Sequence, residues 1–206
     1  MTVGGPRFIS FEGIDGSGKT TQVRALAARL RATGAEVVET REPGGAEGAE
    51  MIRRLLVEGD PSRWSPETEI LLFTAARRDH LERTIAPALA RGAVVLTDRF
   101  ANSTRVYQGV GRADLRASVD ALHSLAIGVE PDLTLVLDID PRVGLARGLA
   151  RGGTEDRFEQ FGADFQIRLR AGFLALAREF PRRVRVVDAS GEAETVAAAI
   201  AAEIGL

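Results

Sequence analysis

Short apolar runs alternate with longer amphipathic stretches along this chain. Five runs rich in β-branched residues predict strands: Arg7 to Glu12, Glu36 to Glu39, Ala93 to Thr97, Leu133 to Ile139 and Val184 to Val187. Between them apolar residues recur at helical spacing, as in the segment from Gly18 to about Ala32. Strands separated by helices predict βαβ units and therefore an α/β fold, a parallel sheet with helices on both faces.

Several helix boundaries can be predicted from single residues. Gly34 ends the first helix. Ser65-Pro66 opens another, with Ser as the N-cap and Pro in the first turn. Asp140-Pro141 begins a helix after the fourth strand, and a last helix begins near Glu192. No repeat or long linker interrupts the pattern, so we expect one domain over residues 1–206.

Composition narrows the classes of function. A net charge of -2 argues against a nucleic-acid partner. The chain has no cysteine and only two histidines, so disulfides, thiolate sites and a histidine zinc site are not expected. No apolar run approaches the roughly 20 residues that span a bilayer, and no signal-peptide pattern is present. We therefore expect a cytoplasmic protein with no membrane partner.

The first predicted strand runs into EGIDGSGKTT, which matches the phosphate-binding P-loop from Gly13 to Thr20. Such a loop directs backbone N–H groups at phosphate oxygens, and the helix that follows adds partial positive charge. Lys19 is expected on the β- and γ-phosphates, and the Thr20 hydroxyl on Mg²⁺. The predicted ATP-binding residues of this loop are Gly13, Ile14, Asp15, Gly16, Ser17, Gly18, Lys19, Thr20 and Thr21.

Asp15 is an unexpected residue in such a loop. Two like charges about 4 Å apart repel by roughly 4 kcal/mol at an effective dielectric near 20. A carboxylate among phosphate-binding groups therefore has to face away from the phosphates or have another partner.

The third predicted strand ends in Asp98-Arg99, an acid at the end of an apolar run. Asp98 is expected near Mg²⁺, directly or through its water, and Arg99 near phosphate. No Glu follows Asp98, and the base-reading motif of GTPases is missing. A small kinase fits this pattern better than a GTPase or an ATPase motor.

The chain also resembles the bacterial thymidylate kinases over nearly its whole length. The blocks that carry the resemblance are FEGIDGSGKTT, TREPGG, LLFTAARRDH, TDRFANSTRVYQGVGR, PDLTLVLDIDP and EDRFEQ. The resemblance implies a P-loop kinase fold with a five-stranded parallel sheet and a small lid. It also implies ATP-dependent phosphorylation of dTMP to dTDP with Mg²⁺, in a homodimer.

Roles for the acceptor side follow from the same resemblance. Phe73 would stack on the thymine ring and Arg77 would bind a thymine carbonyl, while Tyr107 would crowd the 2′ position of the sugar. Arg99 would bridge the acceptor phosphate and the transferring group, and Asp15 would contact the 3′-hydroxyl. The remaining substrate-binding residues that the resemblance implies are Thr104 and Gln108 near the base, and Glu42 and Pro43 in the acceptor wall, with Glu42 near the metal or its waters.

The predicted lid covers about residues 147–160. Some relatives carry an Arg where this chain has Gly16, so basic residues of the lid are expected to compensate. Arg151 and Arg157 are the predicted catalytic residues of the lid, and Arg147 the predicted ATP contact. By composition alone, the charged, Gly-rich segment from Arg151 to Glu159 fits a plain surface loop equally well.

Three alternatives remain open at this point. A deoxynucleoside kinase would use Glu42 as a general base on the sugar hydroxyl. Another nucleoside monophosphate kinase would take a different base, and a non-catalytic module would bind the triphosphate without transferring it.

Overall fold

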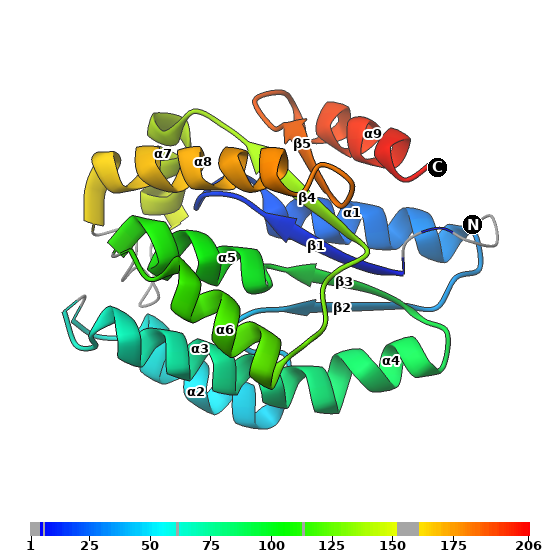
Figure 1. Cartoon of the computed structure of the whole chain (residues 1–206). Helices are drawn as coiled ribbons and strands as arrows, with labels where there is room; N and C mark the ends of the chain where they lie inside the picture. Colours follow the sequence, from blue (N-terminus) through cyan, green and yellow to red (C-terminus); the bar gives the residue numbers. More distant parts are fainter. Residues whose placement is uncertain (1–4, 6, 61, 113, 152–160) are drawn as a thin grey trace.

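A five-stranded parallel sheet runs through the middle of the molecule (Figure 1), in a computed structural model that describes residues 5, 7–60, 62–112, 114–151 and 161–206. The strand order is β2-β3-β1-β4-β5. The strands are β1 (Phe8–Glu12), β2 (Val37–Arg41), β3 (Val94–Asp98), β4 (Leu133–Asp138) and β5 (Val184–Asp188). The predicted α/β fold is confirmed, and all five strands lie where the sequence predicts them, with ends shifted by one or two residues.

Helices connect the strands. They are α1 (Lys19–Ala32), α2 (Glu47–Val57), α3 (Pro66–His80), α4 (Ala86–Ala90), α5 (Ala101–Val106), α6 (Arg116–Ala126), α7 (Pro141–Arg151), α8 (Gly162–Glu179) and α9 (Ala193–Glu203). Two π-helical stretches continue them: Leu81–Ile85 joins α3 to α4, and Tyr107–Arg112 extends α5. π-Helical turns are rare and occur frequently at functional sites.

Two of the predicted helix starts coincide with capping contacts. The Ser65 side chain accepts a hydrogen bond from the Thr68 amide at 3.2 Å, as an N-cap does. The Asp140 carboxylate accepts one from the Arg142 amide at 2.7 Å at the start of α7. Glu192 precedes the first residue of α9 and makes no side-chain capping bond. Local side-chain chemistry therefore marks the starts of α3 and α7.

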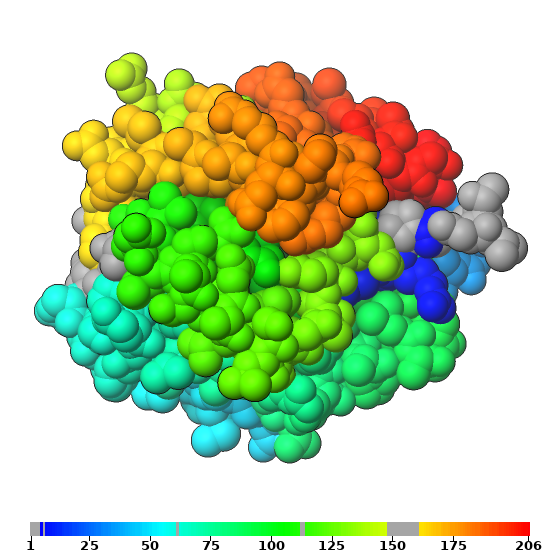
Figure 2. Space-filling view, in the orientation of Figure 1, coloured from blue at the N-terminus to red at the C-terminus, as the bar shows by residue number. Residues whose placement is uncertain are grey.

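The sheet is covered on both faces. On one face α1 and α9 pack against residues such as Ile9, Leu96 and Leu135, which are fully buried. On the other face α5 and α8 pack against Val136, and the turn before α4 packs against Val95. In the space-filling view, green α5 and α6 and yellow-to-orange α8 cover the sheet from that second side (Figure 2). None of the helices in the described part of the chain is long and apolar enough to cross a membrane.

The central strand β1 places the loop that follows it at the functional edge of the sheet. β3 and β4 lie on opposite sides of β1, and ligands of open α/β sheets bind beyond the carboxyl ends of the strands at such a reversal. Side chains alternate along β1, so Glu12 faces the same side as Phe8, which packs near α5. Glu12 and Asp98 are the last residues of β1 and β3, and the two strands pair directly.

Candidate active site

The loop between β1 and α1 wraps around the side chain of Lys19. Gly18, in the left-handed conformation, precedes α1 as its N-cap residue. The Lys19 ammonium is buried and donates to the carbonyl oxygens of Gly13 at 3.1 Å and Ile14 at 2.8 Å. Ser17 is buried within the loop and Thr21 is exposed on the first turn of α1. All nine predicted loop residues therefore lie together around the start of α1.

Burial changes the titration of Lys19. Desolvation and the nearby Arg99 lower the pKa of Lys19 to about 8, although Asp98, Asp15 and Glu12 oppose the change. The ammonium has given up most of its water and keeps only neutral loop oxygens as hydrogen-bond acceptors among the described residues. Phosphate oxygens would be favourable partners for such a group because both charges are compensated in a poorly solvated place.

Thr20 and Asp98 form a pair of oxygen ligands. The Thr20 hydroxyl, at the start of α1, donates to the Asp98 carboxylate at 2.5 Å from the end of β3. Mg²⁺ prefers oxygen ligands and is commonly held by one or two protein groups together with substrate phosphates and water. No group of three or more His, Cys, Asp or Glu ligands occurs in the described residues, so the pair fits that mode rather than a closed protein cage.

Arg99 lies between the P-loop and α5. Its guanidinium donates to Asp15 Oδ1 at 2.5 Å, to the Gly13 carbonyl at 3.1 Å and to Ser103 Oγ at 3.0 Å. It also donates to the Tyr107 hydroxyl at 3.2 Å and lies over the Tyr107 ring at 5.0 Å. The Tyr107 hydroxyl in turn donates to Asp15 Oδ2 at 2.9 Å. The Asp15 carboxylate thus has a cationic and a phenolic partner, which removes the difficulty that the sequence raised.

The protonation states of this group are well separated. Burial opposes the charge on Arg99, but Tyr107, Asp15 and Asp98 hold the pKa of Arg99 above its ordinary value. Burial raises the pKa of the Tyr107 hydroxyl well above its usual range, and Asp15 adds to that effect. Arg99 is therefore a cation and Tyr107 a neutral phenol near neutral pH.

Glu12 is a further buried group that the sequence analysis did not single out. Its carboxylate is fully buried and accepts hydrogen bonds from the amides of Phe100 at 2.9 Å and Ser103 at 3.2 Å. The Ser103 hydroxyl donates to its second oxygen at 2.6 Å. The sequence signal that could have identified Glu12 is an acidic residue at the end of an otherwise apolar strand. The P-loop pattern does not include Glu12, because that pattern begins one residue later, at Gly13.

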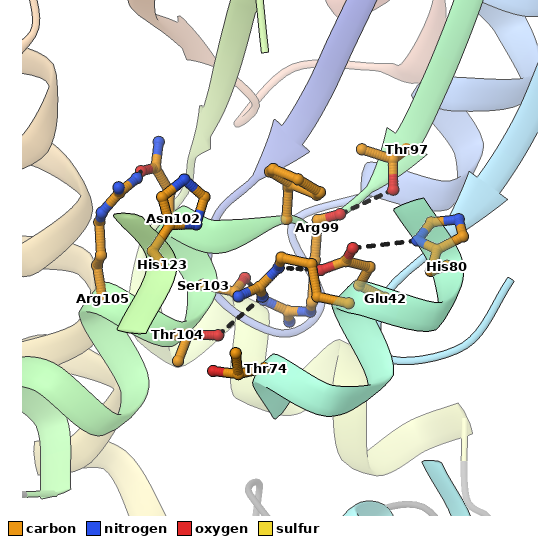
Figure 3. A network of polar contacts seen from close by, with 12 residues as sticks. Glu42, Thr74, His80, Thr97, Arg99, Asn102, Ser103, Thr104, Arg105 and His123 are labelled. Atoms are coloured by element: carbon orange, nitrogen blue, oxygen red, sulfur yellow. Dashed lines mark hydrogen bonds and ion pairs between the residues drawn. The ribbon is translucent and has the colours of Figure 1, made fainter. Parts of the chain in front are cut away.

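The Glu42 side chain is buried between α3 and the end of β2, and both of its oxygens have partners. One carboxylate oxygen accepts a hydrogen bond from Arg77 Nε at 2.7 Å, and the other lies 3.0 Å from His80 Nδ1 (Figure 3). His80 Nε2 lies 2.7 Å from Thr40 Oγ1, so the ring is held at both nitrogens. Glu42 thus orients Arg77, and His80 is a second residue that the sequence analysis missed.

The other predicted acceptor residues surround Arg77. Its Nη2 donates to Thr104 Oγ1 at 2.9 Å, which joins α3 to α5. Phe73 lies one turn earlier on α3 and is half-buried. Gln108 Nε2 donates to Glu69 Oε2 at 3.0 Å, while Gln108 Oε1 is buried and finds no hydrogen-bond partner in the described part of the chain. Pro43 is buried next to Glu42.

Helix α7 touches the tip of the P-loop. A Cβ added at Gly16, where φ is 76°, would lie 2.1 Å from the Gly144 carbonyl oxygen, and one added at Gly144 would lie 2.6 Å from the Asp15 carbonyl oxygen. The backbone of α7 therefore fills the space that a side chain at position 16 would need. This contact explains physically why an Arg at position 16 is incompatible with the arrangement in this chain.

The predicted lid arginines are only partly described. Arg147 is exposed on α7, one turn after Gly144. Arg151 is the last residue of α7, but its side chain is outside what the structure describes. Arg157, and with it most of the predicted lid, lies outside the described residues.

Comparison with known proteins identifies the family. The sequence model of the thymidylate kinase family matches residues 11–200. The chain belongs to the thymidylate kinase family. It is 67% identical to the thymidylate kinase of Dinoroseobacter shibae over 96% of each chain, and 65% identical to that of Jannaschia sp. over 97% of this chain and 96% of the relative.

A solved structure agrees with this assignment. The crystal structure of thymidylate kinase from Ehrlichia chaffeensis superposes with a TM-score of 0.80 at 34% identity, covering 97% of this chain and 98% of that one. The predicted P-loop kinase fold of the thymidylate kinase family is thereby confirmed.

The contact between Gly144 and the P-loop yields a prediction. In Gly144→Ala the added methyl group has to displace either α7 or the Asp15 peptide, because both neighbours are backbone or buried side chain. We expect the affinity for ATP, measured by calorimetry, to fall at least about 10-fold, equivalent to about 1.4 kcal/mol. Val143→Ala, at an exposed position next to it, serves as the control and should bind ATP normally. Unchanged ATP affinity in Gly144→Ala would contradict the importance of this contact.

Proposed function

We propose that this chain catalyses the transfer of the γ-phosphoryl group of ATP to dTMP, giving ADP and dTDP, with Mg²⁺ bound to the nucleotide. Membership of the thymidylate kinase family supports the reaction. The observation that carries the proposal is the position of Arg99. Its guanidinium contacts the P-loop through Gly13 and Asp15. It also contacts Tyr107, at the start of the π-helical extension of α5.

Such a position suits a group that neutralises charge between two anionic ligands. The acceptor phosphate has a second pKa of about 6 and is already an anionic nucleophile at neutral pH. The reaction then requires in-line positioning and charge neutralisation rather than a general base. Arg99 and Lys19 are the cations that the described residues offer for this purpose, and we assign Arg151 and Arg157 of the lid to the same task, with Arg147 as an ATP contact.

The metal belongs at Thr20 and Asp98. When bound there, Mg²⁺ would neutralise charge on the triphosphate oxygens. The two residues would hold it through a hydroxyl and a carboxylate oxygen, and their mutual hydrogen bond at 2.5 Å supports this assignment.

We place the base of the acceptor between α3 and the π-helical extension of α5, which contact each other. Thymine presents two carbonyl oxygens with one N–H between them. Arg77 is a buried donor that Glu42 holds in place, and it could donate to a thymine carbonyl. Gln108 Oε1 is a buried acceptor without a partner among the described residues, and it could accept from the adjacent thymine N–H. Phe73 on α3 supplies an aromatic face for stacking, and Thr104 completes the wall.

The sugar would lie near Asp15 and Tyr107. Asp15 can accept a hydrogen bond from the 3′-hydroxyl, and the Tyr107 ring would leave no room for a 2′-hydroxyl. A deoxynucleoside kinase is less well supported because both Glu42 oxygens are engaged by Arg77 and His80, which leaves no free carboxylate for a general base.

The proposed reaction is tested by an acceptor panel. With ATP and Mg²⁺, a coupled ADP-release assay should show the highest kcat/KM for dTMP, at least about 100-fold above AMP, GMP and UMP, because each of these leaves a buried polar group of the pocket unpaired or meets Tyr107. Thymidine in place of dTMP should give no transfer. Each of three results would contradict the proposal. Faster transfer to thymidine would indicate a deoxynucleoside kinase, and faster transfer to another monophosphate would indicate a kinase for that nucleotide. ATP binding without transfer to any acceptor would indicate a non-catalytic module.

We also propose that the chain forms a homodimer through α2, α3 and α6. These helices pack side by side as one outer layer (Figure 1). Four large apolar side chains of the layer are exposed to solvent: Met51 is 58% exposed, Leu55 39%, Leu71 57% and Leu125 86%. An apolar surface shared by neighbouring helices is typical of a surface that another protein covers.

A charge placed in this layer should separate the subunits. We expect the chain to sediment as a dimer at micromolar concentration, and Leu71→Glu to sediment as a folded monomer, because a buried unpaired carboxylate is costly at an interface. Val186→Glu, at an exposed apolar position on β5, is the matched control and should remain dimeric. A monomeric wild-type chain, or a dimeric Leu71→Glu, would rule out this interface.

A further inference from the structure

Glu12 is a fully buried acid beside the P-loop to which the proposed function assigns no ligand. Its side chain is fully excluded from solvent and both of its oxygens accept hydrogen bonds from the segment 100–103. We propose that Glu12 is a positioning residue for phosphoryl transfer, which fixes the Arg99 guanidinium by capping α5 and by orienting the Ser103 hydroxyl. This inference rests on the role of Arg99 in the proposed function.

The first contact acts on the backbone. Glu12 Oε1 accepts from the amides of Phe100 and Ser103 at the start of α5, and the Ser103 amide is shared with the Phe100 carbonyl at 3.1 Å. Phe100 directly follows Arg99, whose own φ is 72°, a conformation that residues with a side chain rarely adopt. The cap therefore helps to hold the chain in the sharp turn that sends the Arg99 side chain back across the P-loop.

The second contact acts on the guanidinium. Ser103 Oγ donates to Glu12 Oε2 at 2.6 Å, which leaves its lone pairs free to accept from Arg99 Nη1 at 3.0 Å. The same Nη1 donates to the carbonyl of Gly13, the residue after Glu12. Glu12 thus determines the direction of the Ser103 O–H bond. That direction decides whether Arg99 Nη1 faces a lone pair of the Ser103 oxygen or its proton.

The ionised form of Glu12 fits this arrangement, because both of its oxygens then accept. Burial raises the pKa of Glu12 to about 7, while the Ser103 hydroxyl, Arg99, the Phe100 amide and Lys19 favour the ionised form. The substitution Glu12→Gln keeps the shape and one acceptor but replaces the second oxygen with an N–H₂ group. The Ser103 hydroxyl would then have to accept from that N–H₂ group, and its proton would turn away from position 12, which changes the lone pair that it presents to Arg99.

A double-mutant cycle on the full-length protein separates positioning from a purely structural cap. We expect Glu12→Gln to lower kcat for dTMP at least about 10-fold while the KM for ATP changes less than about 2-fold, because the triphosphate contacts of the P-loop are retained. In an Arg99→Ala background the same substitution should change kcat less than about 2-fold, because the group that it positions is already gone. Glu130→Gln, which disrupts a carboxylate paired with Arg105 away from the P-loop, is the matched control and should leave kcat unchanged in both backgrounds.

Ser103→Ala provides a second route if Glu12→Gln does not fold. This substitution keeps the hydrogen bonds between Glu12 and the backbone amides and removes only the hydroxyl that contacts Arg99. It should therefore lower kcat as Glu12→Gln does, and it should have no effect on kcat in the Arg99→Ala background. Equal fold-losses with and without Arg99, or an unchanged kcat in both Glu12→Gln and Ser103→Ala, would overturn the proposal. Transfer to dTMP by the wild-type chain is measured first, so that its absence contradicts the proposed function and not the role of Glu12.

Discussion

The arrangement of the site depends on one cation, the guanidinium of Arg99. It connects the P-loop after β1 with the turn after β3 through four hydrogen bonds, to Gly13, Asp15, Ser103 and Tyr107. The parallel pairing of β1 with β3 brings both turns to the same edge of the sheet. Because the guanidinium is planar and carries five N–H donors, it can satisfy several acceptors at once and hold two loops in a fixed relation.

This arrangement explains why the loop that binds phosphate contains an acid. Asp15 would repel the phosphates if it faced them, but its two oxygens are held by Arg99 and Tyr107. The carboxylate in turn keeps Arg99 charged and directed across the loop before any ligand arrives. Fixing charges in advance of the reaction avoids reorganisation at the moment of transfer.

The sequence predicts the sheet well and the supports of the site poorly. Apolar runs such as Leu133–Asp138 are local signals, so all five strands could be placed without tertiary information. The P-loop glycines, Lys19, Asp98 and Arg99 follow from motifs of fixed spacing. Helix α2 was not singled out, although its apolar and polar residues lie on separate faces, which is itself a sequence signal.

Glu12 and His80 escaped prediction because their roles depend on contacts distant in sequence. Glu12 bonds residues 88 and 91 positions later, and His80 meets Glu42 across 38 positions. Glu42 shows the same limit, because its bond to Arg77 spans 35 positions of the sequence.

The central claim is that the geometry of Arg99, and not its charge alone, organises phosphoryl transfer. Rapid-quench measurement of a single turnover in Arg99→Lys tests this most directly, because Lys retains the charge but presents its donors from one nitrogen and cannot span the same acceptors. We expect a transfer rate at least about 100-fold below that of the wild-type chain, with the protein folded and ATP bound. A rate close to that of the wild-type chain would contradict it.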